Sequence, residues 1–534
     1  MKKSLLSLSI GAFIGGLTLA GAANAATSVA GTGTLTKTTA TGLELNPGGI
    51  GHIGIIPYFS TQNGNHTLIS ITNTDTSNGK AVKVRFRSAA NSDDVFDFTL
   101  FLSPGDVWTA DIGMDAATGL SKLATADNSC TLPAAPGLNR AFITDRLPGS
   151  ASAAQKAEWT REGYIEVLNM ADVPYKSGNN ALYNATKHKA DGTVSCDSAA
   201  LSKLVTNAAL DETALAGLGL DSPSGGLYTN AFIINSANAY QAWSTEATAV
   251  QAVDDSGASA IGRVVFAGQT SDAVPSATAV QLTADPLLVS GVLNPLEFDF
   301  PDLSTPYTGL TLASTSAADQ ANKLSSALSV SSIKNDYSTL GLIGSKTDFT
   351  FSMPTRRYAV AFNYSGQAGT NAPTAAGTPN NSGAKTAQLI YNTDNASHFS
   401  IGNTSLSGNL ICVSPGVSKA VTGYSRSEQA LTSGAVISPG TAAALRFCGE
   451  VSVLTINNDP GSPAGKGVLG ATVAVQNVFT GYQEGWVDIS VKGNTAAGLP
   501  VLGSAYTSAV GAPAAGLSTN YSWTYAHKFV KAAN

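Results

Sequence analysis

The feature that most constrains the fold is a strict alternation of apolar and polar residues in two neighbouring stretches. In KAVKVRFRSA (80–89), Val and Phe alternate with Lys and Arg, and in VFDFTLFL (95–102), Phe and Leu at the even positions oppose Asp97 and Thr99. Successive side chains of a strand point to opposite faces of a sheet. The pattern therefore predicts antiparallel sheet with one buried face and one face in contact with water.

Turn signals around these stretches indicate how the strands connect. HTLISITNTD (66–75) is separated from KAVKVRFRSA by TSNG, and Asn78-Gly79 is a favoured hairpin turn, so we expect a β-hairpin here. Short strands at such spacing are typical of a sandwich. We expect a mainly β protein, with two antiparallel β-sandwich domains and a few short helices in insertions.

The chain divides by composition into four parts. We expect a signal peptide at 1–25, an N-terminal β-sandwich domain at 26–175, a loop-rich α/β insertion or connector at 176–340 and a C-terminal β-sandwich domain at 341–534. Three Ala-rich segments are predicted to form short helices, and these lie at about 150–161, 196–208 and 314–328. Residues 365–386 are rich in Gly, Pro and Asn and are predicted to form an exposed loop.

Two pairs of similar strings indicate an internal duplication. EGYIEV (162–167) matches EGWVDI (484–489), and HTLISITN (66–73) matches EVSVLTIN (450–457). The spacing between the strings differs in the two halves, so coincidence stays an equal alternative. If the similarity is real, the two sandwich domains are related.

The first 25 residues have the features of an export signal. Lys2 and Lys3 precede an apolar stretch, and Ala23-Asn24-Ala25 fits a cleavage site. No later segment has the roughly 18 continuous apolar residues of a membrane-spanning helix. We therefore expect an extracellular or cell-surface protein without a transmembrane helix.

An even number of cysteines in an exported chain predicts disulfides. The four cysteines allow three pairings. We favour Cys130–Cys196 and Cys412–Cys448, because these partners are neighbours in sequence and lie in separate halves. None of the four lies in a C-x-x-C motif, so redox catalysis and zinc binding are weak alternatives.

The low charge of the chain favours protein partners. Only 12% of the residues are charged and the net charge is −6. Without a basic stripe to neutralise phosphates, nucleic acid is an unfavourable partner. Weakly charged faces lose little solvation when they meet. The partners we expect are therefore copies of the chain itself, or outer-membrane lipopolysaccharide or a surface glycan.

No catalytic signature is found in the sequence. Gly49–Gly54 fits G-x-G-x-x-G, but Pro57 and Asn63-Gly64 follow where a helix would have to begin, so we expect the glycines to lead into a sheet. A G-x-S-x-G elbow is missing. We therefore expect a protein that is not an enzyme and has no organic cofactor.

Paired carboxylates are the one candidate for a metal site. Asp93-Asp94 and Asp254-Asp255 lie in predicted loops and are speculative ligands of a structural calcium ion, with solvated turn residues as the alternative. Arg85 and Arg87 lie opposite Asp97. They are expected to form cross-strand ion pairs, and an intermolecular contact is the alternative.

Three strings resemble a known group of proteins. GKAVKVRFRSAANSDDVFDFTLFLSPGDVW, TDFTFSMPTRRYAV and GLPVLGSAYTSA are similar to strings of exported, surface-layer-like cell-surface proteins of Gram-negative proteobacteria. The resemblance implies a non-enzymatic structural protein that coats the outer face of the cell or assembles on it. The alternative is an extracellular adhesin, or a β-sandwich protein that binds a glycan or another ligand through loops at one end of the sandwich.

Overall fold

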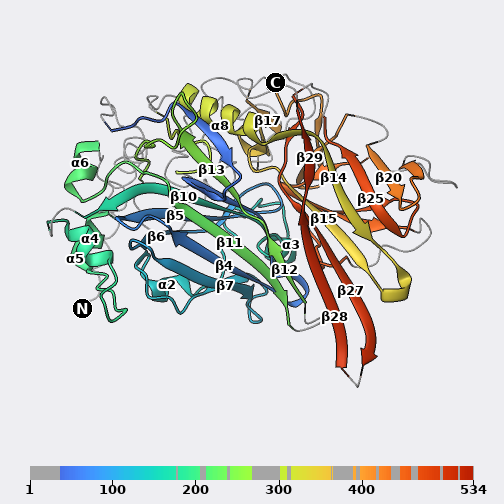
Figure 1. Ribbon diagram of the computed structural model, residues 1–534, viewed down its shortest axis with the longest axis horizontal. Helices are drawn as coiled ribbons and strands as arrows, with labels where there is room; N and C mark the ends of the chain where they lie inside the picture. The colour runs from blue at the N-terminus through green and yellow to red at the C-terminus, as the bar shows by residue number, and fades with distance from the viewer. Residues whose placement is uncertain are drawn as a thin grey trace, which may run out of the picture.

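The computed structural model shows a mainly β protein built from several antiparallel sheets and a few short helices (Figure 1). This confirms the predicted fold class. The structure describes residues 37–175, 179–204, 212–236, 241–266, 301–308, 314–362, 364, 389–392, 397–416, 420–433, 445–458, 467–492, 497–514 and 517–532. The expected signal peptide at 1–25 and the expected loop at 365–386 lie outside these residues.

The first sandwich consists of two sheets, which we call sheets A and B. Sheet A contains, in spatial order, β1 (Gly42–Asn46), β13 (Thr248–Val253), β3 (Ile53–Ser60), β10 (Glu162–Pro174), β5 (Asn78–Ser88), β6 (Asp94–Leu102) and β9 (Thr131–Leu132). Sheet B contains β12 (Gln241–Thr245), β11 (Leu227–Asn235), β4 (Asn65–Asn73), β7 (Val107–Met114) and β8 (Ser121–Ala124), and β2 (Ile50–Gly51) pairs with β11.

The apolar positions of the predicted strands form the core between these two sheets. From sheet A this core receives Val82, Val84 and Phe86 of β5 together with Phe96, Phe98 and Leu100 of β6, and from sheet B it receives Ile69, Ile71, Trp108 and Ile112. All of these side chains are buried. The inward-facing half of the alternation pattern is therefore confirmed.

The predicted hairpin between β4 and β5 is wrong. The strand β4 pairs with β11 and β7 in sheet B, whereas β5 pairs with β10 and β6 in sheet A. The segment between them crosses from one layer of the sandwich to the other, and Asn78-Gly79 already belongs to β5. Side chains hold this crossing: Asn73 donates to the carbonyl oxygens of Asn78 and Ser103, and Asp75 accepts from the backbone N–H of Asn78.

The second sandwich consists of sheets C and D. Sheet C contains β21 (Ala430–Ser433), β20 (Val421–Ser425), β25 (Glu484–Ser490), β14 (Ser329–Ser338) and β26 (Leu499–Pro500), with β29 (Lys528–Lys531) paired to β14. Sheet D contains β24 (Val475–Phe479), β23 (Val451–Asn457), β15 (Lys346–Ser352), β27 (Ser504–Ala514) and β28 (Leu517–Ala526). Ile333, Phe349, Phe351, Leu454, Val487 and Ile489 are among the side chains of its core. Two further sheets are small. One pairs β16 (Val360–Phe362) with β17 (Leu389–Tyr391), and the other contains β18 (Thr404–Ser407), β19 (Leu410–Val413) and β22 (Phe447–Cys448).

A third apolar cluster joins the two sandwiches. It contains Ile55, Tyr58 and Leu168 from the outer face of sheet A, and Val451 and Val453 from sheet D. Sheet A is therefore covered on both faces. The expectation that one face of β5 and β6 contacts water is wrong, because residues 172–224 and the second half of the chain together cover that face.

The segment of residues 467–473, which we call the seam segment, lies in this junction. Asn65 of β4 donates to the carbonyl oxygen of Leu469, and Glu162 of β10 accepts from the backbone N–H groups of Thr472 and Val473. The second sandwich holds the same segment through Asp348 of β15, whose carboxylate accepts from the N–H of Leu469.

Helices occupy the insertions, as expected. They are α2 (Ala135–Leu138), α3 (Ala153–Trp159), α4 (Ala181–Thr186), α5 (Ser198–Leu201), α6 (Glu212–Gly217) and α8 (Ser314–Leu328), with 3-10 turns η1 (Gln62–Gly64), η2 (Ser202–Leu204), η4 (Gly341–Ile343) and η5 (Arg356–Tyr358). The predicted helices at 150–161 and 314–328 correspond to α3 and α8. The third corresponds to α5 and η2, and its end lies outside the described residues.

The sheets do not follow the expected boundaries at 175 and 340. The strands β11, β12 and β13 lie within the expected connector, yet they belong to sheets A and B, and β14 belongs to sheet C. The proposed duplication stays a prediction. The matching strings fall in β10 and β25 and in β4 and β23, but β23 has a parallel neighbour in β24, whereas β4 has antiparallel neighbours.

Both predicted disulfides are confirmed. The sulfur atoms of Cys130 and Cys196 are 2.07 Å apart, and those of Cys412 and Cys448 are 2.04 Å apart. The first bond joins the segment before β9 to the loop before α5, and the second joins β19 to β22. Disulfides are compatible with an oxidising, extracellular environment.

Candidate functional site

The glycine motif near the N-terminus is part of a sheet. Gly49–Gly54 runs through β2 into β3, and no helix follows. A Cβ atom on Gly51 would lie 2.4 Å from the carbonyl oxygen of Val250, and one on Gly54 would lie 2.7 Å from the hydroxyl of Thr229. The motif therefore leads into a sheet, as the sequence indicated, with Gly51 close to a neighbouring backbone and Gly54 close to the side chain of Thr229, and it does not form a phosphate-binding turn.

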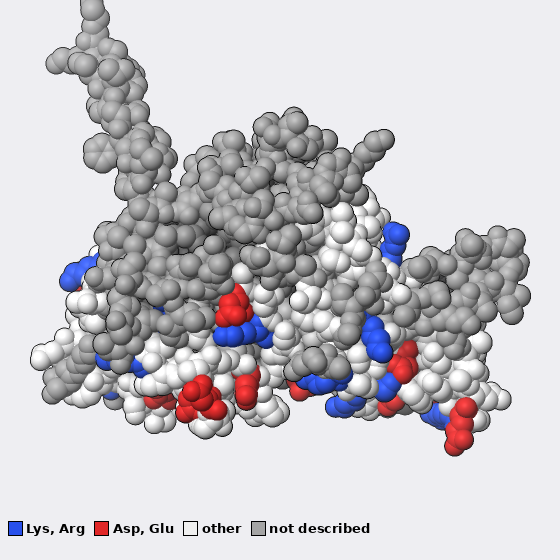
Figure 2. Space-filling view, turned by 90° about the horizontal axis from the view of Figure 1, so that it is seen from above, with Lys and Arg blue, Asp and Glu red and all other residues white. Residues whose placement is uncertain are grey.

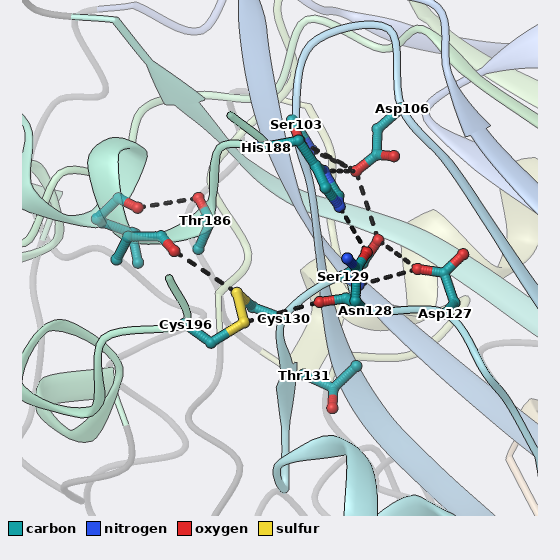
Figure 3. The surroundings of a disulfide bond; sticks show 12 residues. Ser103, Asp106, Asp127, Asn128, Ser129, Cys130, Thr131, Thr186, His188 and Cys196 are labelled. Atoms are coloured by element: carbon teal, nitrogen blue, oxygen red, sulfur yellow. Dashed lines mark hydrogen bonds and ion pairs between the residues drawn. A yellow bond between two sulfur atoms is a disulfide. The ribbon is translucent and has the colours of Figure 1, made fainter. Parts of the chain in front are cut away.

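A cluster of Ser, His and Asp lies beside the first disulfide and resembles a catalytic triad in composition (Figure 3). The hydroxyl of Ser103 is 2.7 Å from Nδ1 of His188, and the carboxylate of Asp106 is 3.2 Å from the same nitrogen. A triad needs serine and carboxylate on different ring nitrogens. Here the other nitrogen, Nε2, contacts the amide oxygen of Asn128 at 2.8 Å.

The serine of this cluster also has a structural partner. Its hydroxyl accepts a hydrogen bond from the backbone N–H of His188 at 3.1 Å and donates to Asp106. The cluster therefore ties the β6–β7 turn to the loop that leads to Cys196. Sequence reasoning missed it because its members are distant in the chain, and only the predicted disulfide placed the two segments near each other.

A buried ionic cluster covers the outer face of sheet A. The pairs on this face are Lys83–Asp97, Arg85–Asp94, Arg85–Asp97, Arg87–Glu166 and Arg146–Asp94. Each of these side chains is at most 8% exposed. Cross-strand pairing of Arg85 with Asp97 is thus confirmed, whereas Arg87 pairs with Glu166 on the neighbouring strand β10.

The second half of the chain extends this cluster. Arg357 of η5 donates to Asp302 at 3.0 Å, and Arg356 forms an ion pair with Glu450, in which both side chains are fully buried. Tyr364 donates to Asp93 at 2.5 Å. Because buried charges must be paired to be tolerated, the cluster constrains how the two sandwiches meet.

Desolvation dominates the acid–base behaviour of the cluster. Burial raises the pKa of Glu166 more than the nearby guanidinium of Arg87 lowers it, and burial likewise raises the pKa of Glu450. Burial lowers the pKa of Lys83. Shifts of this kind are common in active sites, but these groups are enclosed by protein and engaged with one another.

Two hollows in the surface are lined by described residues. The larger, of about 690 Å³, lies between β1, α8 and the C-terminal strand, and Leu43, Lys323 and Lys531 are among its lining residues. The smaller, of about 140 Å³, lies beside α4 and α6. Among the described residues that line them, none is Asp, Glu, His or Cys.

The first candidate calcium pair lies in the ionic cluster. The carboxylate of Asp94 contacts the guanidinium groups of Arg85 and Arg146, and that of Asp93 accepts from the hydroxyl of Tyr364. Two neighbouring cations make Asp94 a poor ligand for a third.

The second pair, Asp254-Asp255, lies in a turn after β13. Asp254 accepts from Ser256 and from the backbone of Ala258, and these hydrogen bonds lower its pKa. The strand register places this turn at the opposite end of sheet A from Asp93. In the part of the chain that the structure describes, no three His, Cys, Asp or Glu side chains are grouped to hold a metal. Calcium binding stays a prediction.

The outer face of sheet B differs from all of these sites because it is exposed and almost uncharged. Leu68 of β4, Val107 of β7 and Tyr228 and Phe232 of β11 are 36–48% exposed. The strands β4, β7, β11 and β12 contain one histidine and one acid, and these form the exposed pair His66–Asp111. We call this surface the sheet B face.

Sequence reasoning missed the strand that contributes most to this face. In β11 Tyr228 and Phe232 are exposed and Ile234 on the same side is half-buried, so apolar residues occur on both sides of the strand and the period-two signal is hidden. On the side of the molecule in Figure 2, Lys, Arg, Asp and Glu form small separate groups among uncharged residues.

Comparisons of this chain with protein-family models, with curated proteins and with solved structures found no match. In the described residues, no helix combines the length and the apolar character needed to cross a membrane.

Proposed function

We propose that this chain is a non-enzymatic structural protein that coats the outer face of a Gram-negative cell and associates there with copies of itself through the sheet B face. The observation that carries the proposal is the exposure of this face. It places Leu68 directly opposite Phe232 on neighbouring strands, with only one ion pair on the surrounding strands. Contiguous exposed apolar surface typically marks an interaction site.

Three other properties support the same proposal. The two disulfides suit an extracellular protein. The ionisable groups of sheet A are engaged in joining the two sandwiches, and the hydroxyl of Ser103 is buried and donates to Asp106. An uncharged face favours a second copy of the same chain, because two such faces meet without burying unpaired charge.

The test is the association state of the mature chain, measured by sedimentation velocity and negative-stain microscopy over a range of concentrations, with and without calcium. We expect the wild type to form oligomers as the concentration rises. Leu68→Ser combined with Phe232→Ser should shift it to monomers. Leu342→Ser is the matched control, because Leu342 is 89% exposed but lies in η4, away from sheet B.

Two outcomes would contradict the proposal. One is a wild-type protein that stays monomeric at every concentration, salt level and calcium level. The other is an oligomer that the Leu68/Phe232 variant leaves intact. Far-UV circular dichroism of each variant establishes that it is folded.

A further inference from the structure

The strand β28 presents three aromatic side chains in a row. Tyr521, Trp523 and Tyr525 occupy alternate positions, so they lie on one face of the strand. Tyr521 is 59% exposed and Tyr525 is 49% exposed. We call these three residues the aromatic row.

The neighbouring strand does not cover the two outer rings, and Trp523 between them is partly buried. Across the β27–β28 pair, the aromatic residues lie opposite Ala509, Thr507 and Ala505. These side chains are too small to cover a ring. Among the described residues no ring–ring contact involves the aromatic row, whereas Tyr424 and Trp486 on sheet C stack on each other at 4.0 Å.

The row lies where the second sandwich is open. Ala505 belongs to the core between sheets C and D, so the row is on the core-facing side of sheet D. The strands β27 and β28 extend well beyond the neighbouring strands in Figure 1. On sheet C, Phe529 of β29 pairs with the core residue Ile333 and is still 51% exposed. Core-facing aromatic side chains therefore reach the surface along this side.

The backbone of β28 is already occupied at these positions. Gln241 of β12 donates to the carbonyl oxygen of Tyr521 at 3.1 Å, and Asn335 of β14 donates to that of Tyr525 at 3.0 Å. Between them, the hydroxyl of Ser522 accepts from the backbone N–H of Ala242 and donates to the carbonyl oxygen of the same residue. Addition of another strand is thus blocked here, and recognition at the row has to use the faces of the rings.

The charge of this region selects the kind of ligand. From Ser504 to Ala526 the sequence contains no Asp, Glu, Lys, Arg or His. An anionic polymer would find no cation on this hairpin, and a cationic one no anion. A flexible neutral polymer with alternating apolar and hydroxyl surfaces meets no such penalty.

We propose that the aromatic row binds a neutral glycan chain. The C–H faces of sugar rings pack on the electron-rich faces of aromatic rings, and the Tyr hydroxyl and Trp N–H groups supply polar contacts at the ring margins. Alternate residues of a strand repeat every ~6.6 Å, which gives a linear array suited to consecutive sugars. This inference concerns sheet D and does not depend on association through the sheet B face.

Affinity electrophoresis in native gels tests the proposal with the neutral polysaccharides dextran, mannan and galactan, and with alginate and heparin as anionic probes. We expect at least one neutral polysaccharide to retard the wild type. Tyr521→Ala combined with Trp523→Ala should weaken that retardation at least tenfold. Tyr521→Phe should retain it, because the ring remains.

The matched control is Tyr424→Ala, which removes a ring from the stacked pair on sheet C and should leave binding unchanged. The proposal is overturned if no neutral polysaccharide retards the protein, if only the anionic probes do, or if the Tyr521/Trp523 variant binds as the wild type does. If no neutral polysaccharide retards the wild type and the Tyr521/Trp523 variant also changes the association state, the row is a protein interface. Sedimentation of the same variants separates these results from a failure of the sheet B proposal.

Discussion

The two outer faces of the first sandwich show opposite distributions of charge and exposure. The outer face of sheet A contains Lys83, Arg85, Arg87 and Glu166, and all of them are buried. The sheet B face is exposed, yet its strands contain one acid, one histidine and one lysine, Lys122 of β8. In most proteins charged groups are exposed and apolar groups are buried.

The second half of the chain contributes to this difference, because it covers part of the outer face of sheet A. It supplies Arg356, Arg357 and Glu450 to complete the ionic cluster on sheet A, and in the described residues it contacts sheet B beside β12 and at Asn65 of β4 but leaves the outward side chains of β4 and β11 exposed. Burial of a paired charge stabilises little but makes an incorrect docking costly. The charged face therefore specifies how the two sandwiches join, and the uncharged face remains available to partners.

The largest effect is expected from breaking a pair on sheet A. Arg87→Met leaves the carboxylate of Glu166 buried without its guanidinium partner, since both side chains are fully buried. We expect the free energy of unfolding to fall by about 3–5 kcal/mol, measured by urea denaturation at neutral pH. Restoration by the double variant Arg87→Met/Glu166→Leu would show that the loss comes from the orphaned charge. A loss below ~1 kcal/mol for the single variant would contradict the burial of this face.

An intermediate effect on stability is expected when pH changes the charge of Asp348, which accepts a hydrogen bond from the seam segment. Burial raises the pKa of Asp348 to about 6, from 3.8 in the unfolded chain. Between these values the folded state keeps a proton that the unfolded state has lost, so stability is greatest below the lower pKa and falls as pH rises through the higher one. The contribution is about 3 kcal/mol for a shift of roughly two units. Asp348→Asn should lose less stability than the wild type between acidic and neutral pH in urea titrations.

If the two proteins lose stability in parallel over this range, Asp348 does not titrate as described. Thr455→Val serves as a control, because it removes one hydrogen bond to the same carboxylate without removing the titrating group. It should keep the fall in stability with rising pH.

The smallest effect is expected on the sheet B face. Nδ1 of His66 lies 3.0 Å from a carboxylate oxygen of Asp111, but the two side chains are 46% and 40% exposed. Asp111→Asn should change the free energy of unfolding by only a few tenths of a kcal/mol, because water and salt screen such a pair. Thermal unfolding at low and high salt measures this. A loss comparable to that of Arg87→Met would remove the contrast between the two faces.

Local patterns predicted the local structure well. The alternation in 80–102 located β5 and β6 and their apolar face, the Ala-rich composition located α8, and cysteine spacing gave both disulfides. Properties that depend on distant parts of the chain were not predicted. TSNG has the composition of a hairpin turn, and only the pairing of β4 with β11 makes it a crossing between sheets.

The same limit applies to the candidate sites. Arg85 with Asp97 could be predicted because the partners face each other on adjacent strands, whereas the pairing of Arg87 with Glu166 depends on the placement of β10 between β3 and β5. The aromatic row was not among the candidate sites, because the exposure of Tyr521 and Tyr525 depends on the packing of distant strands and cannot be read from one strand.

The return of β11 to the first sandwich affects the order in which the chain can fold. One edge of β4 is completed only by β11, far downstream. A chain that emerges N-terminus first therefore has unpaired backbone N–H and C=O groups along this edge until residue 235 arrives. During that interval this edge is a template for wrong pairing.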